Sequence, residues 1–190
     1  MSAIVDLLEE LRDRGALQSG HFVLSSGRHS GRFVQKFRIL EDPKLLAPLA
    51  EALAAHFRAA APTVVVSAAV GGILLGYEVA RALGTKAIFV EKEDGRPVLR
   101  RNFALTPEDR VLVVEDVVTT GQSVMEVLQL VRDRGAEIVG VGAIVQRARA
   151  DFGVAFVALL DLPLDSYAPQ ECAQCKAGVP LTDPGSRRTA

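Results

Sequence analysis

The sequence predicts an α/β fold with a mainly parallel central sheet that is flanked by helices. Two observations carry this prediction. Thr63–Ser67 and Arg110–Val114 are almost continuous runs of apolar residues, which are typical of strands buried on both faces. Amphipathic helical stretches alternate with such strands, as in parallel sheets whose crossover connections are helices. With 190 residues, 49% of them hydrophobic, the chain can bury a substantial core.

The expected elements follow one another in three regions. In residues 1–40, a helix over 2–14 is followed by a short hairpin of 21–24 and 31–35. In residues 41–162, Asp42 and Pro43 begin a helix that runs to about Arg58. The further elements of this core are strands at 63–67, 86–90, 110–114, 138–145 and 154–160, and helices that end near Gly84 and Gly135.

Two segments are expected to lie outside the packed core. Residues 91–105 are charged and contain a turn at Asp94-Gly95, which predicts a flexible hairpin lid. Residues 163–190 mix proline, glycine and polar residues, and we expect them to form a loosely packed C-terminal surface tail.

Charge and cysteine content argue against several classes of protein. The formal net charge is −1 and the sequence pI is about 6.3, whereas nucleic-acid-binding proteins usually carry a strong basic excess. No apolar run approaches the roughly 18 residues that a membrane span needs. Two cysteines are too few for a disulfide scaffold, so the cytoplasm is the expected compartment.

The richest candidate site follows the strand expected at 110–114. The run VLVVEDVVTTGQS, from Val111 to Ser123, passes from an apolar strand through two acids into a turn of small residues and a helix. The backbone N–H groups and partial positive charge at the helix start, with the hydroxyls of Thr119, Thr120 and Ser123, suit a phosphate dianion. We therefore predict a phosphate site in this turn.

Glu115 and Asp116 are adjacent carboxylates next to this predicted anion site. A structural explanation makes Asp116 a helix cap and Glu115 a solvated residue, although a cap needs only one acid. The functional explanation, which we favour, is that both accept hydrogen bonds from neighbouring hydroxyls of a sugar phosphate. They would also stabilise positive charge that develops on that sugar.

This run closely resembles the phosphoribosyl-pyrophosphate (PRPP) motif of the type I phosphoribosyltransferases, with four apolar residues, two acids, two apolar residues and a Thr/Gly/Ser phosphate turn. It contains neither a P-loop nor the dinucleotide-binding glycine pattern. The resemblance implies the type I phosphoribosyltransferase fold and a catalytic role for Glu115 and Asp116. It implies that PRPP is bound by Glu115, Asp116, Val117, Val118, Thr119, Thr120, Gly121, Gln122 and Ser123.

Most of the chain, to about Leu160, is similar to the orotate branch of this family. Leu24–Ser30 followed by Phe33 resembles a hood beside the base, and Arg147 stands where these enzymes grip the orotate carboxylate. The resemblance implies that Thr119, Arg147 and Phe33 bind orotate. The alternative for Arg147 is a surface position at a strand end.

The expected pyrophosphate contacts match the family less closely. Many orotate enzymes have lysine where Ser25 and Gly71 stand, and their mobile loop is richer in lysine and histidine. Lys92 matches a loop lysine, which implies a catalytic and PRPP-binding role, and Arg96 is a candidate to replace missing basic residues. Gly71 and Gly72 match a pyrophosphate-binding loop that often contains a cis peptide. Close helix–strand packing is the alternative explanation for these glycines.

The resemblance implies Mg²⁺-dependent transfer of 5-phosphoribosyl from PRPP to orotate, which yields orotidine 5′-monophosphate and pyrophosphate in pyrimidine biosynthesis. Mg²⁺ is expected mainly on substrate oxygens, so no protein metal site is predicted. A homodimer is implied, and no membrane or nucleic-acid partner is expected. Two alternatives stay open: a phosphoribosyltransferase for a purine or another base, and a PRPP-sensing regulator that binds nucleic acid.

Cys172 and Cys175 form half of a zinc-binding pattern. A four-ligand site needs two more ligands, and the histidines of the chain are His21, His29 and His56. Two free thiols or a reversible disulfide are therefore preferred over a metal site.

Overall fold

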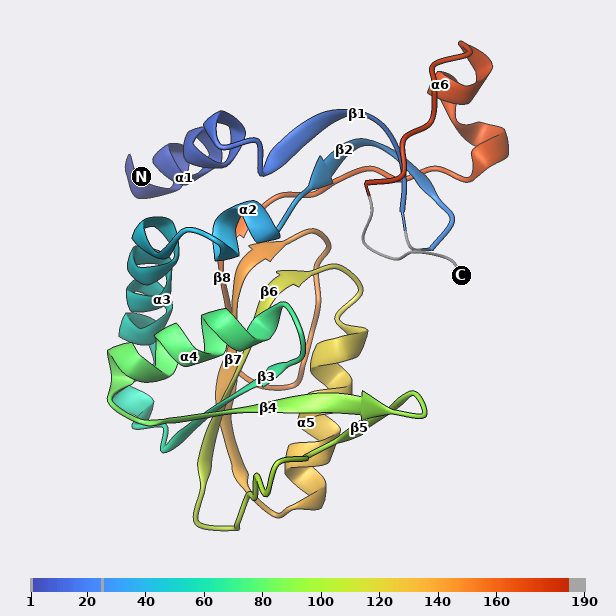
Figure 1. The fold of residues 1–190 in the computed structure, drawn as a ribbon. Helices are drawn as coiled ribbons and strands as arrows, with labels where there is room; N and C mark the ends of the chain where they lie inside the picture. The colour runs from blue at the N-terminus through green and yellow to red at the C-terminus, as the bar shows by residue number, and fades with distance from the viewer. Residues whose placement is uncertain (1, 25, 185–190) are drawn as a thin grey trace. The chain divides into compact units, whose positions relative to one another are not determined.

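A computed structural model describes residues 2–24 and 26–184 (Figure 1). The chain divides into two compact units, one of Leu40–Leu162 and one that combines Met1–Ile39 with Pro163–Ala190. Among the described residues, no helix is long and apolar enough to cross a bilayer.

The larger unit is built on a six-stranded sheet with the strand order β5-β4-β3-β6-β7-β8. Neighbouring strands pair in parallel, except for the antiparallel pair of β4 and β5. The mainly parallel sheet that the sequence predicts is therefore confirmed. The strands are β3 (Val64–Ala68), β4 (Lys86–Glu93), β5 (Arg96–Val98), β6 (Arg110–Val118), β7 (Glu137–Gln146) and β8 (Phe156–Asp161).

Helices cover both faces of this sheet, as Figure 1 shows. α3 (Pro43–Phe57), which continues into the 3-10 turn η1 (Arg58–Ala60), and α4 (Gly72–Leu83) pack on one face, and α5 (Gln122–Asp133) packs on the other. The ring of Phe57 lies over β7, where a side chain on Gly140 would collide with it. Because both faces are covered, the three valines 64–66 of β3 are all fully buried.

The predicted start of α3 is confirmed. Pro43 occupies the first turn, and the side chain of Asp42 accepts a hydrogen bond of 2.9 Å from the backbone N–H of Lys44. This bond satisfies one of the amides that a helix start leaves unpaired.

The predicted hairpin at Asp94-Gly95 is present as the connection between β4 and β5. Both turn residues have positive φ, 50° and 77°, which matches the twist of antiparallel strands. The hairpin ends at Val98, and Leu105 beyond it is buried in the core. The rings of Phe103 and Phe89 are 5.1 Å apart. The second half of the expected lid 91–105 is therefore anchored by apolar contacts.

The smaller unit contains α1 (Ser2–Asp13) and the antiparallel strands β1 (Leu17–Val23) and β2 (His29–Val34), which confirms the predicted N-terminal helix and hairpin. α2 (Phe37–Leu40) follows β2. The C-terminal segment adds η2 (Pro169–Glu171) and α6 (Ala173–Lys176) to this unit.

Residues 163–184 are mostly exposed, in line with the predicted surface tail, but the expected loose packing is wrong where they contact the N-terminal strands. Tyr167 pairs with His29, and Thr182 pairs with Phe22, in isolated β-bridges. Cys172 is only 2% exposed. The physical reason is that a two-stranded ribbon has free edges whose backbone groups need partners, and the C-terminal segment supplies them. Residues 185–190 of the predicted tail lie outside the described residues.

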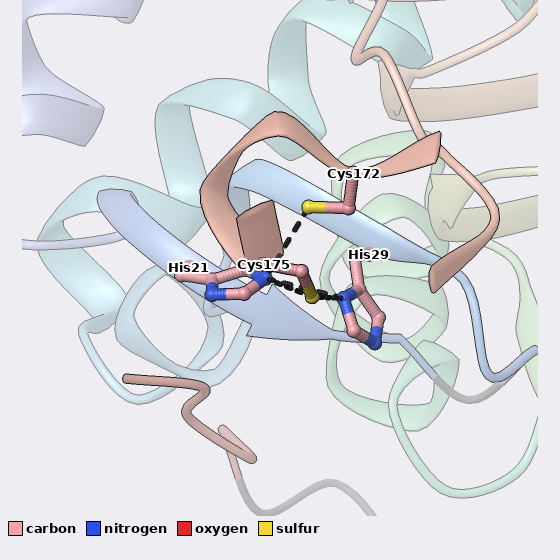
Figure 2. A group of neighbouring side chains, drawn as sticks. All are labelled: His21, His29, Cys172 and Cys175. Atoms are coloured by element: carbon pink, nitrogen blue, oxygen red, sulfur yellow. Dashed lines mark hydrogen bonds between the residues drawn. The ribbon is translucent and has the colours of Figure 1, made fainter. Parts of the chain in front are cut away.

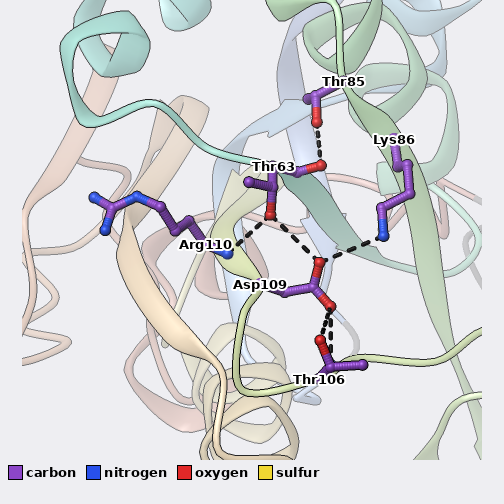
Figure 3. Close-up of polar contacts among 6 residues, drawn as sticks. All are labelled: Thr63, Thr85, Lys86, Thr106, Asp109 and Arg110. Carbon is purple, nitrogen blue, oxygen red and sulfur yellow. Dashed lines mark hydrogen bonds and ion pairs between the residues drawn. The ribbon is translucent and has the colours of Figure 1, made fainter.

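A polar cluster around Asp109 joins the amino ends of β3, β4 and β6 (Figure 3). Asp109 Oδ1 accepts hydrogen bonds from Thr63 Oγ1 (3.3 Å) and Lys86 Nζ (3.4 Å). Its Oδ2 accepts from the backbone N–H (2.8 Å) and the hydroxyl (3.2 Å) of Thr106. Burial by itself raises the pKa of Asp109, but the bonds from Thr106 and Lys86 outweigh burial and lower this pKa. The cluster therefore stabilises the edge of the sheet opposite to the strands' carboxyl ends.

We expect Asp109→Asn to lower the free energy of unfolding by about 1–2 kcal/mol at neutral pH, because the variant weakens charge-assisted bonds at a buried site. The folded pKa lies below the unfolded value of about 3.9, so this stabilisation is present above the unfolded pKa and is lost as the pH falls through the folded pKa. Urea unfolding of both proteins should show a stability difference that shrinks from about pH 7 to about pH 3. A difference that stays constant over this range would contradict the prediction.

Candidate active site

Two loops lie at the point where the order in which strands are added to the core sheet reverses. From β3 the chain passes through α4 to β4 on one side, and from β6 it passes through α5 to β7 on the other. Since β3 and β6 are paired neighbours, the loops at 69–71 and 119–121 follow adjacent carboxyl ends. Such a reversal point is the usual ligand site of an open α/β sheet.

The loop after β6 surrounds an open hollow. α5 begins at Gln122, and its N-cap, Gly121, has a φ of 80° and carries no side chain that could cap the helix. The helix start, at the positive end of its dipole, therefore suits an anionic ligand, although the backbone N–H of Gln122 donates to Thr120 Oγ1 at 3.4 Å. The structure brings the predicted phosphate-binding residues together here, since the lining residues are Glu115, Val117, Val118, Thr119, Thr120, Gly121, Gln122, Ser123 and Val124.

Glu115 and Asp116 lie inside β6 and not beyond its end. The prediction that this strand ends at Val114 is wrong, because β7 continues to pair with β6 as far as Val118, while β3 pairs only as far as Val114. Glu115 is 9% exposed and Asp116 is 2% exposed. The backbone N–H of Asp116 donates to Glu115 Oε1 (3.1 Å), and that of Val117 donates to Asp116 Oδ1 (2.6 Å).

These positions exclude the structural explanation for the acid pair. Glu115 is buried, so it is not a solvated rim residue. Asp116 does not cap α5, because the N-cap of that helix is Gly121. Adjacent buried carboxylates are uncommon in protein interiors and are a frequent feature of functional sites. The pair therefore fits a ligand that brings hydroxyl donors or positive charge.

The loop after β3 contains a cis peptide between Ala69 and Val70, as the family resemblance implies. Gly71 is the buried N-cap of α4. A Cβ on Gly72 would lie 3.0 Å from Ser67 Cβ and 3.7 Å from Glu115 Oε1. Close packing therefore favours glycine at position 72, and the start of α4 lies beside the Glu115 carboxylate. Whether Gly71 and Gly72 also bind PRPP stays a prediction.

Lys92 does not line the hollow but is linked to it through α5. Its Nζ is 2.6 Å from Glu126 Oε2, and Gln122 Nε2 donates to Glu126 Oε1 (3.0 Å). The hydrogen bond from Lys92 lowers the pKa of Glu126, with support from Gln122 and against the effect of burial. The sequence analysis did not identify Glu126. Its spacing of four residues from Gln122 on a helix is the pattern that could have indicated this contact. Arg96 is exposed on β5.

Arg147 lies at the end of β7 beside the end of β6. Its backbone N–H donates to the carbonyl of Val118 (2.8 Å), which precedes Thr119. Burial lowers the pKa of Arg147, although a guanidinium stays charged at neutral pH. Its Nε is buried and has no hydrogen-bond partner among the described residues. An unpaired buried donor is costly, so Arg147 fits an anionic ligand better than a surface role.

Two further predictions concern the smaller unit. Phe33 is half-buried on β2, with its ring 5.7 Å from that of Phe22. Its contact with orotate stays a prediction. Ser25, where many family members carry lysine, lies outside the described residues.

Comparison with known proteins agrees with this geometry. The model of the phosphoribosyl transferase domain matches residues 37–153. The orotate phosphoribosyltransferase of Chlorobium phaeobacteroides is 45% identical over 183 residues, which are 95% of each chain. That of Pelotomaculum thermopropionicum is 48% identical over 176 residues, 92% of this chain and 93% of its relative. The crystal structure of orotate phosphoribosyltransferase from Aeropyrum pernix matches with a TM-score of 0.70 at 27% identity, and the match covers 82% of this chain and 93% of that one. The chain belongs to the phosphoribosyltransferase family, among the orotate phosphoribosyltransferases.

Proposed function

We propose that this chain transfers the 5-phosphoribosyl group of PRPP to orotate, with release of pyrophosphate and formation of orotidine 5′-monophosphate. One observation carries the proposal: the start of α5 and the buried Glu115 line one hollow at the reversal point of the sheet. Asp116 follows Glu115 in the same strand without lining the hollow, and the unpaired Nε of Arg147 lies next to the same strand end. Relatives that cover almost the whole chain carry the name of this activity.

The hollow at 119–123 suits the 5′-phosphate of PRPP, which the amides of α5 and the hydroxyls of Thr119, Thr120 and Ser123 would bind. Glu115 and Asp116 would then accept hydrogen bonds from the ribose 2′- and 3′-hydroxyls. Departure of pyrophosphate leaves positive charge on the anomeric carbon and ring oxygen, as in glycoside cleavage. The two carboxylates lower the energy of that state by electrostatics and form no covalent bond to the sugar.

Arg147 would hold the carboxylate of orotate in a forked hydrogen bond, and Thr119 would contact the base. This assignment uses the donor that the described residues leave unpaired. Purines have no carboxylate, so Arg147 would favour orotate over them. Orotate is already an anion, so the reaction needs no strong protein base, and the protein contributes mainly by positioning the two substrates.

The acid pair also fits an Mg²⁺-bound substrate. In the part of the chain that the structure describes, the close group of three or more potential metal ligands belongs to the smaller unit, and none of its members lines the hollow. Two carboxylates and several hydroxyls suit an ion that keeps most of its bonds to phosphate oxygens and water. When bound, Mg²⁺ would offset the charge of the departing pyrophosphate.

Pyrophosphate would be held by Lys92, Arg96 and the start of α4 at Gly71 and Gly72. The pair of Lys92 with Glu126 does not oppose this role, because the lysine is 53% exposed and such a pair contributes only about 0–1 kcal/mol. Lys92 can therefore exchange Glu126 for a phosphate oxygen at little cost. The homodimer, the cytoplasmic location and the role in pyrimidine biosynthesis stay predictions.

Incubation of the protein with PRPP, Mg²⁺ and a panel of free bases tests the proposed function. We expect orotate to be consumed, and we expect a chelator to stop the reaction, while adenine, hypoxanthine and xanthine persist. Consumption of a purine instead of orotate would favour an enzyme for another base. Binding of PRPP with turnover of no base would favour a PRPP sensor.

Gly121→Ala should weaken PRPP binding by about tenfold, because the variant shifts the backbone of the phosphate loop. The position has a φ of 80°, and a Cβ there would lie 2.9 Å from Phe152 Cε1. Calorimetric titration with PRPP measures the effect. Gly153→Ala is the matched control, since Gly153 has a φ of 68° but open space around it and does not line the hollow. Equal affinity losses in both variants would show that the loop geometry at Gly121 is not required.

A further inference from the structure

The smaller unit brings together four side chains of types that bind transition metals (Figure 2). His21 lies on β1, His29 begins β2, and Cys172 and Cys175 come from the segment around α6. Their candidate ligand atoms all lie within 4.8 Å of one another. His21, His29 and Cys172 are buried, and Cys175 is exposed. The proposed transfer reaction uses none of these four side chains.

The distances between these atoms match the edges of a zinc coordination tetrahedron. Zinc bonds of about 2.3 Å to sulfur and about 2.0–2.1 Å to nitrogen place ligand atoms roughly 3.3–3.8 Å apart. His21 Nε2 is 3.1 Å from His29 Nδ1, 3.4 Å from Cys172 Sγ and 3.6 Å from Cys175 Sγ. Cys175 Sγ is 3.2 Å from His29 Nδ1. Small movements of the side chains would therefore suffice to surround an ion.

The orientation of His21 supports ligation. Its Nδ1 is 2.8 Å from the carbonyl oxygen of Val179, and since a carbonyl only accepts, Nδ1 carries the proton. Nε2 then has a lone pair directed at the other three side chains. A backbone carbonyl that fixes the ring of a histidine in this way is the usual outer partner of a metal-bound imidazole.

The donor set also decides the kind of metal. Two thiolates balance the charge of a divalent cation, which makes the buried site electrically neutral. Sulfur and imidazole ligands in a tetrahedron favour zinc over magnesium or calcium, which take oxygen ligands. Four protein ligands leave no position for water or substrate, as in structural sites. We propose that His21, His29, Cys172 and Cys175 bind one structural Zn²⁺.

The bound ion would join two chain segments that lie about 150 residues apart in the sequence, the N-terminal hairpin and the C-terminal segment. The C-terminal segment already contacts β1 and β2 through backbone hydrogen bonds. The N–H of Tyr167 donates to the carbonyl of His29, and the N–H of Thr182 donates to the carbonyl of His21, each at 2.8 Å. A small unit with few buried apolar side chains gains much from a structural metal. Zinc would therefore hold the C-terminal segment on the N-terminal strands.

Elemental analysis of the full-length protein, purified under reducing conditions without chelator, tests the proposal. We expect about one zinc per chain. After removal of zinc, one equivalent of Co²⁺ alone should give the visible absorption of a tetrahedral cobalt–thiolate site. Zinc removal should lower the thermal unfolding midpoint and expose residues 163–184 to proteolysis, and added Zn²⁺ should reverse both effects.

Variants distinguish side chains that bind zinc from side chains that only pack in the fold. Cys175→Ser changes an exposed side chain, so it should fold, and it should weaken zinc binding about 100-fold or more. His56→Gln is the matched control, because His56 is exposed on α3 in the larger unit and should leave the zinc content unchanged. The proposal is overturned if reduced wild-type protein neither contains nor takes up Zn²⁺ or Co²⁺. Full zinc affinity in Cys175→Ser would also overturn it. All of these readouts are independent of the transfer reaction.

Discussion

Asp116→Asn is expected to reduce turnover by about 100-fold or more, equivalent to about 2.7 kcal/mol of transition-state stabilisation. Asparagine keeps the oxygen that accepts from the Val117 N–H, at 2.6 Å, and removes only the negative charge. At 2% exposure, Asp116 is poorly screened by water, so its charge acts strongly on a sugar that becomes positive. Steady-state kinetics with saturating PRPP and orotate measure the effect.

The matched control is Asp133→Asn, which makes the same change at an exposed position at the far end of α5. It should leave turnover within about twofold of the wild-type value. Thermal unfolding of both variants shows whether the fold survives. A correctly folded Asp116→Asn enzyme with near-normal turnover would remove Asp116 from the mechanism.

Arg147→Ala is expected to raise the KM for orotate about 30- to 100-fold, because charge-assisted hydrogen bonds contribute about 2–3 kcal/mol. The KM for PRPP should change little, since Arg147 does not line the phosphate hollow. Arg147→Lys should recover only part of the loss, because lysine keeps the charge but lacks the planar fork. Initial rates with one substrate varied at a time give both constants.

Arg149→Ala is the control for Arg147, since Arg149 is exposed two residues further along the same loop. It should leave both KM values close to those of the wild type. Equal increases in both constants for Arg147→Ala would contradict a role in orotate binding and would indicate a general effect on the site.

The turn between β6 and α5 was predictable because its signal is local in sequence. Thr119, Gly121 and Ser123 are close neighbours, and a strand followed by a glycine turn and a helix places them at one helix start without any distant contact. The same holds for the Asp94-Gly95 hairpin and for the Asp42 cap. In each case the signal and the structure that it predicts lie within a few residues.

The end of β6 was not predictable in this way. Glu115 and Asp116 look like residues after a strand, but β7 extends its pairing with β6 to Val118 and places both acids inside the sheet. The pair of Lys92 with Glu126 likewise depends on how β4 and α5 pack together. A single sequence contains no information on the register of neighbouring strands beyond the apolar pattern.

By itself the sequence determined the class of fold, the position of the glycine turn between β6 and α5 and the family to which the chain belongs, because these depend on short patterns of apolar, acidic and glycine residues. Only the tertiary structure decided that residues 163–184 pack with the N-terminal strands, and that Cys172 and Cys175 meet His21 and His29. About 150 residues separate these two pairs along the chain. Contacts at that separation arise from long-range strand pairing, which local propensity and periodicity do not encode.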